Sequence, residues 1–275
     1  MLLHTIRMRL AVAVAMVLCM VACLTVSRAT LVPVPAMFEA SLLRQPSPVM
    51  AMLVVAISFL GCAALVSVAL GRWRPEAGLF TAAVGVAVYA IRGGSMTQTL
   101  QYADGRSVFL QMLVELVLLY GVVVVAAMIG CKFSGNRAAV TNDDPEESER
   151  NSLNQNLLAI AVQVVVMGIV LMMLGQGESK KQAMWAVGLA AYVGAVGAHW
   201  AFPIRRGEWL AMGPLFVGMV GYAMAFVRPP LIAIGIVQQP LATPLPLHYV
   251  SMGIAGALLG HWMSRKWQEE ALERE

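Results

Sequence analysis

Long apolar segments decide what this chain can fold into. Eight of them alternate with short polar stretches. They span residues 10–26, 49–71, 77–91, 108–131, 157–175, 183–202, 209–227 and 247–263. An α-helix rises about 1.5 Å per residue and needs about 20 apolar residues to cross the hydrocarbon core of a bilayer. The pattern predicts an all-α fold, a polytopic transmembrane helical bundle of about eight helices.

The composition agrees with a membrane protein and excludes several soluble classes. Hydrophobic residues make up 59% of the 275 residues and charged residues 12%, whereas a soluble domain carries about a quarter charged residues. The net charge of +4 comes from basic residues scattered between apolar segments, which does not indicate nucleic-acid binding. We therefore expect the lipid bilayer, and no nucleic acid, as a partner.

One polar run divides the chain into two membrane halves. Residues 132–156 (KFSGNRAAVTNDDPEESERNSLNQN) are too polar to lie in hydrocarbon. They predict an acidic, solvated linker between a first half, residues 1–131, and a second half, residues 157–263, followed by a charged tail, residues 264–275. The loop at 231–237 (LIAIGIV) is apolar but too short to cross, which suggests a re-entrant or surface-lying piece.

The first apolar segment allows three interpretations. Basic residues precede it and Ser27, Arg28 and Ala29 follow it, which fits a secretory signal peptide cleaved after Ala29. The apolar run is long for a signal peptide, and more spans follow, so we favour an uncleaved membrane anchor. A lipoprotein processing site at Cys23 is a weaker alternative, because apolar residues continue beyond the cysteine.

The distribution of lysine and arginine predicts the orientation. Cytoplasmic loops of membrane proteins carry an excess of these residues. On the side of the amino terminus lie Arg7, Arg9, Arg72, Arg74, Lys132, Arg137, Arg150, Arg205, Arg206, Arg265, Lys266 and Arg274. On the other side lie Arg28, Arg44, Arg92, Arg106, Lys180, Lys181 and Arg228. We therefore expect an inner-membrane protein with both termini in the cytoplasm.

Two spans of the second half end in nearly the same sequence. Residues 194–200 read GAVGAHW and residues 256–262 read GALLGHW, which suggests a bundle built from repeated two-helix hairpins. Collection of aromatic and basic residues at any membrane boundary explains the likeness equally well. The small residues Gly194, Ala198, Gly256 and Gly260 predict close helix packing, either within the bundle or between copies of the chain.

Glu115 is the one acid deep inside an apolar segment (VFLQMLVELVLLYG). A carboxylate in hydrocarbon costs several kcal/mol unless it is paired or protonated, so Glu115 is a candidate proton or transport site. Gln111 lies one turn away, and Arg92 and Tyr89 are within reach in the expected threading. The structural alternative is a salt bridge or a neutral acid that serves packing.

His199 and His261 occupy matching places in the two similar spans. Two imidazoles at one depth can bind a metal ion or a b-type haem. However, neither helix supplies two ligands at i and i+4, so ordinary histidines at the membrane boundary are the simpler interpretation, and we expect no cofactor.

Motifs of phosphate-binding loops, zinc proteases and serine hydrolases are absent from the sequence. We therefore predict a non-enzymatic, membrane-embedded scaffold or complex subunit, with a protein partner or a second copy of the chain bound through small-residue helix faces. The alternatives are a small-solute or proton-coupled permease that uses Glu115 and, more weakly, a haem or metal protein that uses His199 and His261.

Overall fold

The fold is all-α, as the sequence predicts. The computed structural model describes residues 2–30, 41–71, 74, 76–101, 106–133, 145–176, 179–204, 206–228 and 239–273. Within these ranges the regular secondary structure is helical and contains no β-strand.

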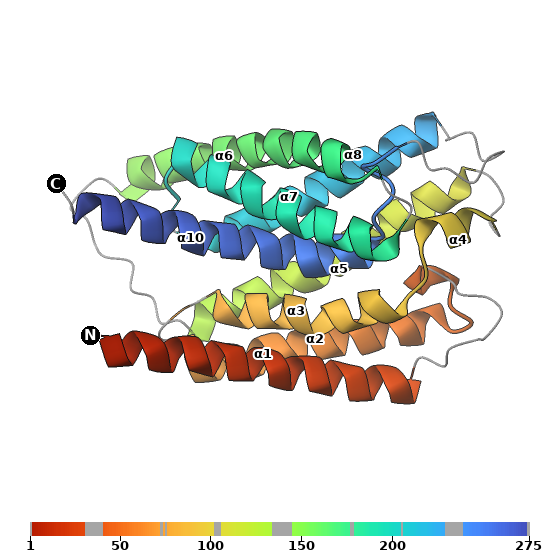
Figure 1. Ribbon diagram of the computed structural model, residues 1–275, viewed down its shortest axis with the longest axis horizontal. Coiled ribbons are helices and arrows are strands. Elements are labelled where there is room, and N and C mark those ends of the chain that lie inside the picture. The colour runs from red at the N-terminus through yellow and green to blue at the C-terminus, as the bar shows by residue number, and fades with distance from the viewer. Residues whose placement is uncertain are drawn as a thin grey trace.

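Eight helical segments run back and forth along the bundle in the part of the chain that the structure describes (Figure 1). They are α1 (Leu2–Thr30), α2 (Pro48–Leu70), α3 (Ala77–Arg92), α5 (Ser107–Phe133), α6 (Pro145–Leu174), α7 (Lys180–Ala201), a 3₁₀ segment η2 (Gly207–Met212) continued by α8 (Gly213–Val227), and α9 (Pro246–His248) continued through a π-helical turn (Tyr249–Gly253) into α10 (Ile254–Leu272). Two short helices, η1 (Leu42–Arg44) and α4 (Met96–Gln101), lie between them.

The start of α1 and the end of α10 lie at the same end of the bundle, which we call the N/C end; the opposite end is the far end (Figure 1). Helices that start at the N/C end alternate with helices that return to it. Both termini lie at the same end because the number of these helical segments is even and each segment runs opposite to the one before it.

Six helices among the described residues are long and apolar enough to cross a membrane: Arg7–Ala29, Pro48–Leu70, Ser107–Phe133, Leu153–Leu174, Lys180–Ala201 and Gly207–Val227. Large apolar side chains such as Leu65, Met173 and Val49 are exposed on these helices or at their ends. Soluble proteins rarely expose apolar surface on this scale. The chain is therefore a multi-pass membrane protein.

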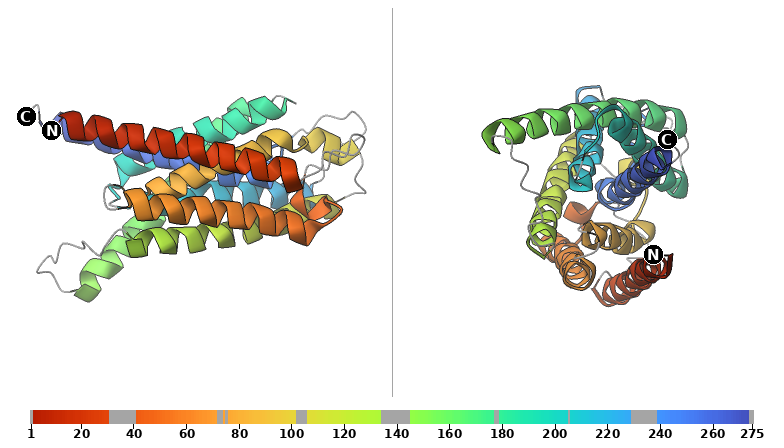
Figure 2. Two further views of the ribbon diagram at one scale, coloured as in Figure 1. Left: turned by 90° about the horizontal axis from the view of Figure 1, so that it is seen from below. Right: turned by 90° about the vertical axis from the view of Figure 1, so that its left-hand side faces the viewer.

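The shorter apolar helix α3 lies inside the bundle, and most of its side chains are buried. Its sequence is rich in alanine and glycine, which let neighbouring helices approach closely. Helix α1, by contrast, lies at the edge of the bundle (Figure 2). It buries one stripe of small residues, Cys19, Cys23 and Ser27, against α3 and α2.

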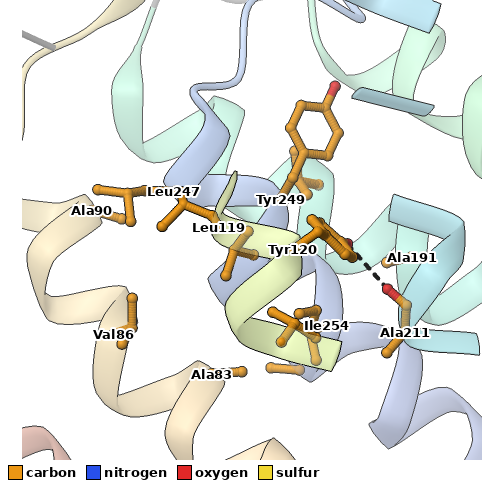
Figure 3. Close-up of a cluster of buried hydrophobic side chains, with 14 of the residues drawn as sticks. Ala83, Val86, Ala90, Leu119, Tyr120, Ala191, Ala211, Leu247, Tyr249 and Ile254 are labelled. Atoms are coloured by element: carbon orange, nitrogen blue, oxygen red, sulfur yellow. Dashed lines mark hydrogen bonds between the residues drawn. The ribbon is translucent and has the colours of Figure 1, made fainter. Parts of the chain in front are cut away.

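The two halves of the chain meet in a continuous apolar core (Figure 3). Ala83, Val86 and Ala90 of α3 and Leu119 of α5 lie near Leu247, Tyr249 and Ile254 of the last helical segment. The Tyr120 hydroxyl of α5 reaches across this core and donates to the Ala211 carbonyl at 3.0 Å. The hydroxyl is satisfied there, as a buried phenol requires.

The structure tests one of the two predictions made for the polar and loop segments. Helix α6 begins at Pro145, so the second part of the stretch predicted as a linker is helical. Proline suits the first turn of a helix, because its missing N–H would have no partner there. The apolar stretch 231–237 lies outside the described residues.

Candidate functional site

Glu115 is fully buried in α5, in the half of this helix that follows its first residue, Ser107. Its Oε2 atom accepts a hydrogen bond from the Ser41 hydroxyl and a second one from the Leu43 backbone N–H at 3.3 Å. Leu43 belongs to the short 3₁₀ helix η1 between α1 and α2, and Ser41 is the residue just before it. The carboxyl group therefore holds this turn against α5. We call these three residues the Glu115 site.

The second carboxyl oxygen of Glu115, Oε1, is buried and has no hydrogen-bond partner among the described residues. An unsatisfied buried oxygen costs about 1–3 kcal/mol, and more if it carries charge. Among the described residues, this open oxygen favours a proton or a bound cation at the Glu115 site over a purely structural role.

The residues expected around Glu115 have other contacts. Gln111, one turn from Glu115 on α5, is exposed. Arg92 donates to the Ser27 hydroxyl of α1 at 2.9 Å, and the Tyr89 hydroxyl lies 2.8 Å from the Ser58 hydroxyl of α2. Both side chains thus link α3 to the first two helices, because α3 turns that face toward α1 and α2 rather than toward α5.

His199 and His261 lie in direct contact near the N/C end. Their ring centroids are 4.8 Å apart and the rings are nearly perpendicular, at 81°. Nδ1 of His199 lies 2.9 Å from the Ser264 hydroxyl, whereas neither ring nitrogen of His261 has a partner among the described residues. Both side chains are buried.

This pair does not fit a haem. Two axial imidazoles stand on opposite faces of the macrocycle, each with a nitrogen about 2 Å from the metal. Rings that touch edge to face leave no plane between them for the macrocycle. The structure also contains no group of three or more His, Cys, Asp or Glu placed to hold a metal ion, within the residues that it describes.

Close approach of η2 explains part of the burial of His261. A Cβ atom at Gly207 would lie 2.5 Å from Cδ2 of His261, so only glycine lets the backbone pass there. The Gly207 N–H donates to Oε1 of Glu76 at 3.3 Å, and the Cys131 thiol donates to Oε2 of Glu208 at 3.2 Å. These contacts tie the end of α5 and the start of α3 to η2.

The glycines predicted to pack helices do so inside the chain. A Cβ at Gly256 would lie 2.1 Å from the Gly188 carbonyl oxygen, and one at Gly260 would lie 2.4 Å from the Tyr192 carbonyl oxygen, both on α7. Gly194 faces α6, where a Cβ would meet the Gln163 carbonyl oxygen at 3.0 Å. Ala198 is fully buried in the same helix. These small-residue faces are thus occupied within one chain.

Several buried polar groups have no counterpart among the predicted site residues. Gln163 of α6 is fully buried and donates to the Leu210 carbonyl at 2.8 Å; a lone glutamine in an apolar run is a signal that the sequence does carry. Cys19 and Cys23 of α1 and Cys62 of the neighbouring helix α2 are also buried. The spacing of Cys19 and Cys23, one turn apart, places both on one helix face, but nothing in the sequence pairs them with Cys62.

Comparison of the chain with protein-family models, with curated proteins and with solved structures finds no match.

Proposed function

We propose that this chain is a non-enzymatic membrane-embedded scaffold or complex subunit that binds a partner protein at its N/C end. The supporting observation is a charged helical arm at that end. Helix α10 continues to Leu272, well past its apolar part. Along this arm Arg265 pairs with Glu269 at 3.5 Å and Lys266 with Glu270 at 3.1 Å.

The arm also exposes an aromatic side chain. Trp267 is 41% exposed between these charged residues. Surface ion pairs one turn apart contribute only about 0.3–0.5 kcal/mol each, but they favour the helical form of the arm. A tryptophan on a preformed, charged helix is the kind of side chain that anchors protein interfaces.

A pair of photo-crosslinking variants tests this function. A photoreactive phenylalanine analogue replaces Trp267 in one variant and Trp185 in a matched control; Trp185 is 65% exposed on α7. We expect a discrete protein adduct in native membranes from position 267 and none from position 185. Absence of an adduct at 267, or the same adduct from both positions, contradicts the proposal.

The same proposal places the chain in an inner membrane with both termini in the cytoplasm. Support comes from the shared end of α1 and α10 (Figure 1) and from the excess of lysine and arginine on that side. The test uses two variants in a cysteine-free background, one with a single cysteine added after Glu275 and one with a single cysteine in place of Arg106. In intact cells, a membrane-impermeant maleimide should react with the cysteine at position 106 and not with the one after Glu275. The reverse pattern contradicts the orientation.

A proton-coupled permease is the second candidate, and the unpartnered Oε1 of Glu115 favours it. Vesicles with a trapped pH indicator should then show proton flux that Glu115→Gln abolishes. Glu208→Gln is the control, because it removes an acid at the opposite end that contacts Cys131. No flux in the unaltered protein, or equal loss in both variants, excludes this candidate.

A further inference from the structure

Two buried histidine rings meet where α7, α10 and η2 come together at the N/C end. Helices α7 and α10 lie side by side (Figure 1). The ring of His199, in the last turn of α7, has its centroid 4.8 Å from that of His261 on α10. The His261 ring also lies against η2, since a Cβ atom at Gly207 would be 3.2 Å from its Nε2. We call His199 and His261 the histidine pair.

The histidine pair also fastens the base of the charged arm. Nδ1 of His199 lies 2.9 Å from the hydroxyl of Ser264. Ser264 is fully buried, whereas Arg265, Lys266 and Trp267, which follow it, are exposed. The arm thus leaves the bundle directly after the residue that His199 contacts, and the histidine pair ties the base of the arm to α7.

The surroundings of His261 favour a neutral ring. Both of its ring nitrogens are buried and have no hydrogen-bond partner among the described residues. A neutral imidazole leaves one N–H and one lone pair unpaired there, whereas an imidazolium would leave two N–H groups and a positive charge unpaired. Burial of an unpaired charge costs far more than burial of a neutral polar group. A charge on one ring of the pair also opposes a charge on the other.

The acids on the neighbouring elements already have hydrogen-bond donors. Glu76, which is buried next to the start of α3, accepts the Gly207 N–H at 3.3 Å. Glu208 of η2 accepts the Cys131 thiol at 3.2 Å. These carboxyl groups therefore serve contacts other than the histidine pair.

The basic residues nearby add positive charge. The guanidinium of Arg74 lies 5.1 Å from the ring centroid of Trp262, the residue that follows His261. Arg265 stands one turn beyond His261 on the same helix face, and its partner Glu269 is exposed, so water screens that ion pair. A proton on the histidine pair would thus add a further positive charge to a part of the molecule that already carries two.

We propose that the histidine pair is an acid-sensitive lock on the charged arm. While both rings are neutral, they hold Ser264 and the base of the arm against α7 and η2; uptake of a proton by the pair weakens this contact and releases the arm. A histidine in water takes up a proton near pH 6.5, so the lock is complete above this pH and weakens as the pH falls below it. The lock acts on the arm itself and needs no partner protein, so it does not depend on the proposed function.

Amide hydrogen exchange of the full chain in a nonionic detergent tests the lock, read from a peptide that covers residues 258–268. For each ring that gains a proton only in the open state, the opening equilibrium constant should be about 30-fold larger at pH 5 than at pH 7.5. We expect the protection of this peptide, corrected for the intrinsic pH dependence of exchange, to fall by at least this factor.

Two variants of the histidine pair should reduce this response. His261→Phe keeps a ring at this position but cannot take up a proton, and it should remove about 30-fold of the fall in protection. His199→Asn keeps an amide that can bond to Ser264, should have the same effect, and serves if His261→Phe is not folded at pH 7.5.

The matched control is His248→Phe. His248 is also buried, but it lies in α9, where its Nδ1 accepts the Leu245 N–H at 3.2 Å. Its replacement should leave the acid response of the arm peptide unchanged. No acid response in the unaltered protein, the same response in both variants of the histidine pair, or loss of the response in His248→Phe overturns the proposal.

Discussion

The packing of α10 against α7 predicts a large effect from one added methyl group. In Gly256→Ala the new Cβ would lie 2.1 Å from the Gly188 carbonyl oxygen, 3.0 Å from its carbon and 3.2 Å from its Cα. All three atoms are backbone, so no side chain can rotate away, and the helices must separate. Overpacking of this kind costs about 1–3 kcal/mol.

Alanine also has a favourable effect that must be subtracted. It stabilises a helix relative to glycine by up to about 1 kcal/mol. Gly121→Ala on α5 isolates this effect, because a Cβ at Gly121 meets nothing within 4 Å. We expect Gly121→Ala to be neutral or stabilising and Gly256→Ala to be less stable than Gly121→Ala by about 1–3 kcal/mol.

The assay is reversible unfolding in mixed micelles with an increasing fraction of a denaturing detergent, followed by the loss of helical circular dichroism. Gly260→Ala should resemble Gly256→Ala, because its Cβ would lie 2.4 Å from the Tyr192 carbonyl oxygen. If Gly256→Ala is as stable as Gly121→Ala, α7 and α10 do not pack at this distance and the reasoning is refuted.

Three further predictions use the same protein preparation. Tyr120→Phe removes the hydroxyl that donates to the Ala211 carbonyl and should lower the free energy of unfolding by about 0.5–1.5 kcal/mol; an unchanged midpoint would show that the halves do not depend on this bond. Ser41→Ala leaves Oε2 of Glu115 with the Leu43 N–H alone and should lower stability by about 1–3 kcal/mol, an effect that disappears in a Glu115→Gln background if the two side chains interact. The purified protein should show no Soret absorbance, since the contact between His199 and His261 leaves no room for haem; a Soret band lost in His199→Phe would contradict this geometry.

The sequence by itself determined the fold class and the approximate position of each helix. Hydropathy and length are local properties, and a stretch such as Pro48–Leu70 fits the thickness of a bilayer whatever surrounds it. The sequence also marked Glu115, because an acid in an apolar run is conspicuous without any tertiary information. Likewise, the spacing of the glycines at 256 and 260 predicted close helix packing.

Only the tertiary structure decided which side chains meet. Glu115 contacts Ser41, 74 positions earlier in the chain, rather than Gln111, Arg92 or Tyr89. His199 and His261, predicted to share a depth, lie in ring contact, and Tyr120 of the first half donates to the Ala211 carbonyl of the second half. The physical reason is that lipid-facing and inward-facing positions of a membrane helix are both apolar, so the sequence barely specifies how each helix is rotated. That rotation is set by packing against neighbours, and it alone decides which polar groups come into contact.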